Sequence, residues 1–209
     1  MLTRCGDDLL SIAVDTPADA QALAKQLRQN GAWLEVVPGI DSVVVRFDIA
    51  ALDGAAAQAA IETVIAEGIQ PLPASGKVVE IPVVYGGMYG PDLDALSKET
   101  NLSVDEIVGL HTSRDYPVEM VGFTPGFAFI GGLDERLHVP RRAEPRQRVP
   151  AGSIGIADGR TGIYALASPG GWALIGRTSH TLFDPHAEDP FVLAPGMRVH
   201  FCAVAADDS

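Results

Sequence analysis

The C-terminal half of the sequence alternates short apolar stretches with turns rich in glycine and proline, and this pattern restricts the fold more than any other feature. Long helices are disfavoured there, because proline and glycine interrupt each stretch. The Asp158-Gly159-Arg160 segment, between two apolar runs, is typical of a β-hairpin loop. Closely spaced short strands predict a small closed β-barrel. The expected strands are residues 117–123, 153–157, 163–166, 172–177 and 199–204.

The first 76 residues show a different pattern, in which strands and helices alternate. Thr16 followed by Pro17 predicts the start of a helix, and Asp53 predicts the start of a second one. A further strand at residues 77–85 would complete a ferredoxin-like unit, or it would be the first strand of the next domain. The other expected strands are residues 9–14, 33–37 and 42–48.

The segment 71–76, with its two prolines, a serine and a glycine, is the most linker-like part of the chain. Two short helices are expected after it, one near Pro91 and one that begins at Ser103 with Glu106 in capping-box spacing. The predicted class is therefore α+β. The predicted domains are an N-terminal ferredoxin-like α/β domain at residues 1–76 and a β-barrel domain at residues 77–209.

Composition excludes several functions. The net charge of −12 argues against nucleic acid as a partner. No apolar run approaches the roughly 20 residues that span a bilayer, and no secretory signal is evident, so we expect a soluble cytoplasmic protein without membrane contact. The two cysteines, Cys5 and Cys202, fit a reducing compartment. We expect no metal site, because no HExxH or CxxC motif occurs, and no Walker A loop is present.

Positive charge gathers in one stretch of this acidic chain. Residues 136–148 contain five arginines and one glutamate, and prolines at positions 140, 145 and 150 stiffen this region. Arginine offers a planar fork that binds carboxylates and phosphates. The alternative is a solvated basic loop or an ion-paired interface with a partner.

Two glycine-containing segments could form the walls of a binding site. The loop at 122–129 contains three phenylalanines and two glycines, and it would present either an apolar wall beside backbone amides or a buried turn. The Gly170-Gly171-Trp172 turn would let a ligand approach the backbone closely, with the tryptophan ring above it. The alternative for this second segment is a hairpin with a core tryptophan.

Three other residues have side chains that could take part in catalysis or binding. His111 ends a predicted helix and could exchange a proton near neutral pH, or it could be a cap or packing residue. Arg177 could supply a charge. Ser153 resembles a nucleophile elbow, but Ala151 replaces the first glycine of that motif and a strand is expected to follow, so we reject it. The remaining histidines have no ligand spacing and are expected to be structural or exposed.

Seven segments occur together in one order and resemble the PxpB/KipI family, also labelled allophanate hydrolase subunit 1. Two positions depart from the family pattern: Val84 stands where many members have Cys, and Ala165 stands where Pro is usual. The segments are IPVVYGG at 81–87, GPDL at 90–93, His111, GFTPGFAFIGGL at 122–133, PRRAEPRQRVPAGS at 140–153, SPGGWALIGRT at 168–178 and LFD at 182–184.

The resemblance implies a cyclophilin-like fold for the barrel and a stable partner, the PxpC/KipA-like subunit. With a third, PxpA-like subunit, such pairs form ATP-dependent 5-oxoprolinase, which opens the lactam of 5-oxoproline to glutamate. ATP would serve the complex as a whole, since phosphorylation of the lactam oxygen would make the carbonyl carbon open to attack by water. Some relatives instead inhibit a sporulation histidine kinase, and this interaction role is the alternative. A prolyl-peptide binder, suggested by the barrel type alone, is the third.

Under the leading hypothesis, His111 is the candidate for proton transfer, and the arginines bind the substrate carboxylate or a phosphorylated intermediate. The glycines and the 122–127 loop offer amides to developing negative charge. The candidate substrate-binding residues are Arg141, Arg142, Arg146, Arg148 and Arg177, together with Phe123, Gly126, Gly170, Gly171 and Trp172.

Overall fold

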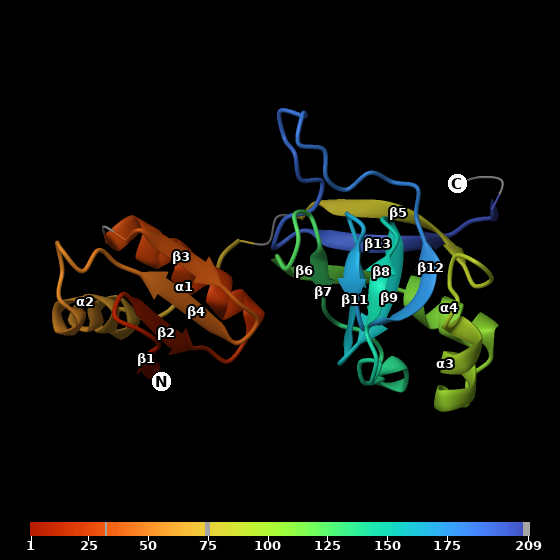
Figure 1. Cartoon of the computed structure of the whole chain (residues 1–209), viewed down its shortest axis with the longest axis horizontal. Helices are drawn as coiled ribbons and strands as arrows, with labels where there is room; N and C mark the ends of the chain where they lie inside the picture. The colour runs from red at the N-terminus through yellow and green to blue at the C-terminus, as the bar shows by residue number, and fades with distance from the viewer. Residues whose placement is uncertain (32, 74–75, 207–209) are drawn as a thin grey trace. The chain divides into compact units, whose positions relative to one another are not determined.

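The computed structural model describes residues 1–31, 33–73 and 76–206. The chain divides into two compact units, Met1–Ala74 and Ser75–Ser209, each with its own hydrophobic core (Figure 1). Residues 74 and 75, in the middle of the predicted linker, lie outside the described residues. The predicted α+β class is confirmed.

The N-terminal unit is a four-stranded antiparallel sheet with two helices. Its strand order is β1-β2-β4-β3. The predicted caps are confirmed, because the side chains of Thr16 and Asp53 accept hydrogen bonds from the first turns of α1 and α2. The elements are β1 (Leu2–Arg4), β2 (Leu9–Ala13), α1 (Pro17–Asn30), β3 (Glu35–Pro38), β4 (Ser42–Arg46) and α2 (Gly54–Ala66).

The fourth strand of this sheet is not the one that ferredoxin-like topology suggested. The short strand β1, which the sequence pattern did not predict, occupies the edge next to β2. Strand β5 (Val78–Tyr85) instead belongs to the barrel, where Ile81 and Val83 are fully buried. Pro82 lies in β5 outside the short stretch that pairs with β12, so it blocks no hydrogen bond on that side.

The second unit is built around a closed seven-stranded barrel, as predicted (Figure 1). Around the barrel the strands follow the order β10-β7-β6-β13-β5-β12-β9, and β9 pairs with β10 to close it. Strands β5 and β13 are parallel neighbours. Besides β5, the strands are β6 (Asp115–Val121), β7 (Ala128–Ile130), β9 (Ser153–Ala157), β10 (Arg160–Ile163), β12 (Ala173–Arg177) and β13 (Arg198–Ala203).

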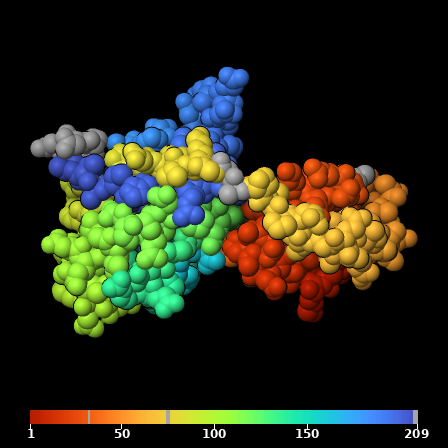
Figure 2. All heavy atoms as spheres, turned by 180° about the vertical axis from the view of Figure 1, so that it is seen from behind, coloured from red at the N-terminus to blue at the C-terminus, as the bar shows by residue number. Residues whose placement is uncertain are grey.

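A separate two-stranded sheet is formed by β8 (Arg146–Val149) and β11 (Ser168–Gly170). Between β12 and β13 the chain extends away from the barrel, as the blue protrusion in Figures 1 and 2 shows. Within this segment an isolated antiparallel β-bridge joins Phe183 and Phe191, whose ring centroids are 5.1 Å apart.

Two helices, α3 (Leu93–Thr100) and α4 (Val104–Thr112), precede β6. The capping box predicted at the start of α4 is present, with the side chains of Ser103 and Glu106 each bonding to the other residue's backbone N–H. Among the described residues, no helix is long and apolar enough to cross a membrane.

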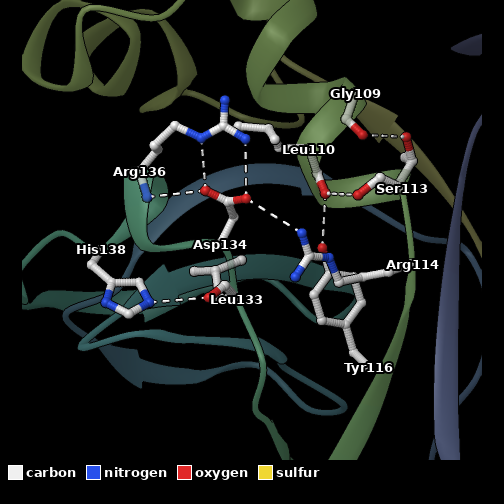
Figure 3. A network of polar contacts seen from close by, with 10 residues as sticks. Gly109, Leu110, Ser113, Arg114, Tyr116, Leu133, Asp134, Arg136 and His138 are labelled. Atoms are coloured by element: carbon white, nitrogen blue, oxygen red, sulfur yellow. Dashed lines mark hydrogen bonds and ion pairs between the residues drawn. The ribbon is translucent and has the colours of Figure 1, made fainter.

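Asp134 fixes the chain that follows α4 to the short 3₁₀-helix η1 (Glu135–Leu137) (Figure 3). Its carboxylate accepts a hydrogen bond from Nε of Arg136 at 2.8 Å and one from Arg114 at 3.3 Å. The bonds from Arg136, followed by the charges of both arginines, lower the pKa of Asp134 to about 2. The carboxylate is therefore ionised at neutral pH.

Candidate functional site

Asp92 is the centre of the polar network beside the arginine-rich segment. It stands just before α3 and is 9% exposed. One carboxylate oxygen accepts hydrogen bonds from Arg146 at 2.7 Å and from Arg142 at 3.2 Å. The other accepts the backbone N–H of Leu174 at 2.7 Å. Arg142 and Arg146 are thus held in ion pairs within the chain.

The other two arginines of the segment are more accessible. Nε of Arg141 lies 2.9 Å from Asp158, and the two side chains are 62% and 50% exposed. Such an exposed pair is weak and can release its guanidinium to a ligand. Arg148 is exposed, and its side chain has no hydrogen bond or ion pair with any residue that the structure describes. Among these predicted ligands, Arg141 and Arg148 therefore remain open to a small molecule.

The arginine-rich segment and the twin-glycine turn lie side by side. Strand β8 pairs with β11, and Gly170 stands opposite Arg146. The backbone N–H of Arg142 also donates to the carbonyl of Gly171 at 2.7 Å. Two segments that are well separated in the sequence therefore form one surface.

A cavity of about 240 Å³, here called the aromatic pocket, opens at this surface. Phe127, one of its lining residues, has its ring centroid 4.9 Å from Tyr164 and 5.6 Å from Trp172, both in edge-to-face contact. Phe123 is 65% exposed, whereas Trp172 is only 5% exposed. The pocket is lined by Phe123, Phe127, Phe129, Arg141, Pro145, Tyr164, Pro169, Gly170, Gly171 and Trp172.

Two predicted glycines allow close approach of neighbouring groups around this pocket. A side chain at Gly170 would collide with the ring and hydroxyl of Tyr164. Gly126 has φ +76°, and a Cβ there would lie 2.8 Å from Cβ of Phe183 and 2.9 Å from Cβ of Ala165. Glycine is required at both positions for packing, and Gly126 does not line the pocket itself.

A second cavity, here called the Arg177 cavity, has a volume of about 470 Å³. The two cavities have neighbouring residues in their walls: Tyr164 lines the aromatic pocket, and the next residue, Ala165, lines the Arg177 cavity. Arg177 lines this cavity and not the aromatic pocket, which Arg141 lines. The cavity is lined by Tyr89, Ala151, Gly152, Ala165, Arg177, Thr178, Ser179, His180 and Thr181.

The placement of His111 does not support its predicted role in proton transfer. Its side chain is fully buried and lines neither cavity. Nδ1 lies 2.6 Å from the Tyr85 hydroxyl and Nε2 lies 2.9 Å from the Thr161 hydroxyl. Burial lowers the pKa of His111 to about 3, so the ring is neutral at pH 7. The geometry corresponds to the alternative interpretation, a core histidine that orients two neighbouring hydroxyl groups.

The buried His111 should make the stability of the protein depend on pH. An unfolded histidine takes up a proton near pH 6.5, whereas the folded one resists protonation down to about pH 3. Stability is therefore complete above pH 6.5 and falls as the pH drops below it, by up to about 1.4 kcal/mol per pH unit. His111→Gln should remove this part of the dependence. Denaturant unfolding at pH 7 and pH 5 tests this, and equal pH dependence in both proteins would contradict it.

Two important residues of this region carry no sequence signal of their role. Asp92 was part of the GPDL segment at 90–93, but its pairing with arginines 50 and 54 positions away has no local signal. Tyr164 lies within the short apolar run expected as a strand at 163–166, which is typical of a core residue. Burial raises the pKa of its hydroxyl, which stays protonated at neutral pH.

The sequence matches a known family over most of its length. The family model "Carboxyltransferase domain, subdomain C and D" matches residues 2–193. The B-type subunit of 5-oxoprolinase from Escherichia coli O157:H7 is 45% identical over 184 residues, which cover 86% of this chain and 82% of that protein.

Solved structures agree with the fold. The crystal structure of TTHA0988 matches with a TM-score of 0.79 and 33% identity, over 95% of this chain and 40% of that longer one. The urea amidolyase of K. lactis matches with a TM-score of 0.81 over 99% of this chain and 15% of that protein, and at 19% identity this likeness concerns the fold alone. The chain belongs to the carboxyltransferase domain subdomain C and D family, and its predicted membership of the PxpB/KipI family is confirmed.

Proposed function

We propose that this chain is the PxpB-type subunit of an ATP-dependent 5-oxoprolinase. The observation that carries the proposal is the aromatic pocket, because it gathers five of the predicted substrate-binding residues at one place in a member of this family. These residues are Phe123, Arg141, Gly170, Gly171 and Trp172.

The chemistry of the pocket fits 5-oxoproline. This substrate has a flat lactam ring and a carboxylate. Exposed Phe123 offers an aromatic surface to the ring, and it packs edge-to-face on buried Phe127, which in turn packs edge-to-face on buried Trp172. Arg141 would bind the carboxylate through two parallel hydrogen bonds, replacing its exposed contact with Asp158.

The backbone of the pocket could stabilise negative charge. Gly170 and Gly171 carry no side chains to shield their amides from a ligand. Amides that are fixed before the reaction favour the charge that develops on a lactam oxygen when its carbonyl carbon is attacked. Loss of such a donor typically costs about a hundredfold or more in kcat.

The proposed complex contains a PxpC/KipA-like subunit and a PxpA-like subunit, with ATP as a substrate of the whole assembly. A site shared between subunits would account for the small volume of the aromatic pocket. Its volume of about 240 Å³ is below the roughly 300 Å³ usual for a complete small-molecule site. A facing subunit would supply the missing wall, and exposed Phe123 would then be covered.

Arg141→Gln should reduce 5-oxoproline turnover by the reconstituted complex. A charge-assisted hydrogen bond contributes about 1.5–3 kcal/mol, so kcat/KM should fall about 10–100-fold. Glutamate formation and ADP release are measured together. Arg136→Gln is the matched control, because Arg136 is an exposed arginine paired with Asp134 that lines neither cavity. Equal activity of complexes assembled with and without this chain would overturn the proposed function.

A further inference from the structure

We propose that the Arg177 cavity is a phosphoryl-binding site. Its volume of about 470 Å³ lies within the range of roughly 300–1,000 Å³ that small-molecule sites occupy. It differs from the aromatic pocket in its residues, because six of its nine lining residues carry an arginine, a histidine or a hydroxyl side chain.

Arg177 is the main cationic group of this cavity and is held in place. Its Nε donates to the carbonyl of Ala151 at 3.0 Å, which fixes the plane of the guanidinium. Within the described residues, its two terminal nitrogens have no hydrogen-bond partner. An arginine fixed through Nε with both terminal nitrogens available can bind two oxygens of one anion.

The segment that follows Arg177 adds neutral donors. Oγ1 of Thr178 accepts the backbone N–H of His180 at 3.1 Å, which shapes a tight turn. The backbone N–H groups of Ser179 and Thr181 have no acceptor in the part of the chain that the structure describes. Ser179 and Thr181, which each carry a hydroxyl group, also line the cavity. Backbone amides beside hydroxyl groups are the usual donors to phosphate oxygens.

The cavity also lacks the groups that would repel an anion. No aspartate or glutamate is among its nine lining residues, although the whole chain has a net charge of −12. A carboxylate has two oxygens in one plane, whereas a phosphoryl group presents three oxygens in different directions. Donors from a guanidinium, two amides and several hydroxyls therefore suit the phosphoryl group better.

This site deepens the proposed function in one respect. If this chain serves an ATP-dependent enzyme, ATP would transfer its γ-phosphoryl group to the lactam oxygen, leaving ADP, and water would then release inorganic phosphate as glutamate forms. The Arg177 cavity would hold this phosphate, and the assignment rests on the proposed function. Binding of phosphate to the cavity does not rest on it, because every donor named above belongs to this chain.

Calorimetric titration of the full chain with inorganic phosphate tests the proposal. We expect saturable binding of one phosphate per chain, and at least about tenfold weaker binding of acetate. Arg177→Gln should weaken phosphate binding about 10–100-fold, through loss of a charge-assisted contact. Arg114→Gln is the control, because Arg114 is an exposed arginine of the same unit that lines neither cavity. It should bind phosphate like the unaltered chain.

A second variant distinguishes loss of phosphate binding from misfolding of the chain. Thr181→Val removes one hydroxyl group from an exposed residue, and it should weaken phosphate binding several-fold while leaving the unfolding transition unchanged. Absence of saturable phosphate binding, acetate binding as tight as phosphate, or equal losses in the Arg177 and Arg114 variants would overturn the proposal. If phosphate fails to bind while the reconstituted complex still forms glutamate, this site is wrong and the proposed function stands.

Discussion

Replacement of Asp92 by alanine is expected to lower the free energy of unfolding by about 3 kcal/mol. The substitution removes the acceptor shared by Arg142 and Arg146 and the acceptor of the Leu174 N–H. Two guanidinium groups of one segment would then lie close together without a counter-charge. The amide of Leu174, which is buried, would also lose its partner. Denaturant unfolding monitored by tryptophan fluorescence measures the loss.

Asp158→Asn is the matched control for this experiment, because Asp158 has φ +50°, a conformation that asparagine tolerates and alanine does not. This substitution also removes the charged partner of an arginine in the same segment, but the Arg141–Asp158 pair is largely exposed. Exposed pairs contribute about 1 kcal/mol or less. A loss at position 92 no larger than the loss at position 158 would show that the Asp92 network does not stabilise the fold.

Gly152→Ala is expected to be more damaging still, with a loss of at least about 4 kcal/mol or failure to fold. Gly152 has φ +80°, and a Cβ there would collide with the carbonyl oxygen of Thr178. That carbonyl cannot move aside easily, because the amide of Thr178 donates to the carbonyl of Gly152 at 2.9 Å. The amide of Gly152 also donates to the carbonyl of Tyr164 at 2.7 Å, so backbone bonds hold the glycine on both sides.

Gly196→Ala separates the two causes of this loss. Gly196 also has a positive φ, +86°, but no atom lies within 4 Å of the position a Cβ would take. Only the strained backbone conformation should matter there, at about 1–2 kcal/mol. Thermal and denaturant unfolding of both variants give the comparison, and similar losses at the two positions would refute the collision at Gly152.

Local features of the fold were predictable because their signals lie within a few residues. Thr16, Asp53 and Ser103 each begin a helix where the capping pattern placed it. The Asp158-Gly159 turn joins β9 and β10 as expected. These elements depend on hydrogen bonds between near neighbours, which the order of residue types determines.

Features that depend on distant partners were harder to predict. Strand β1 has three residues and too little pattern to identify, and its partner β2 decides its conformation. The roles of the arginines depended on where Asp92 and Asp158 would lie, which no local pattern shows. For His111 the sequence left two interpretations open, and full burial decides between them. A histidine next to solvent could exchange protons, whereas this one is enclosed by aromatic rings such as that of Phe201, 4.3 Å away.

The parallel pairing of β5 and β13 has a consequence during translation. These are the first and last strands of the barrel unit, and each is the other's neighbour in the closed ring. The ring therefore stays open until the ribosome has released the segment that ends at Ala203. The N-terminal unit is free of this constraint, because its strands and helices are all made earlier. Nascent chains should thus carry a folded first unit while the apolar strands of the second still lack their final partner, so the interval before β13 emerges is the stage most exposed to aggregation.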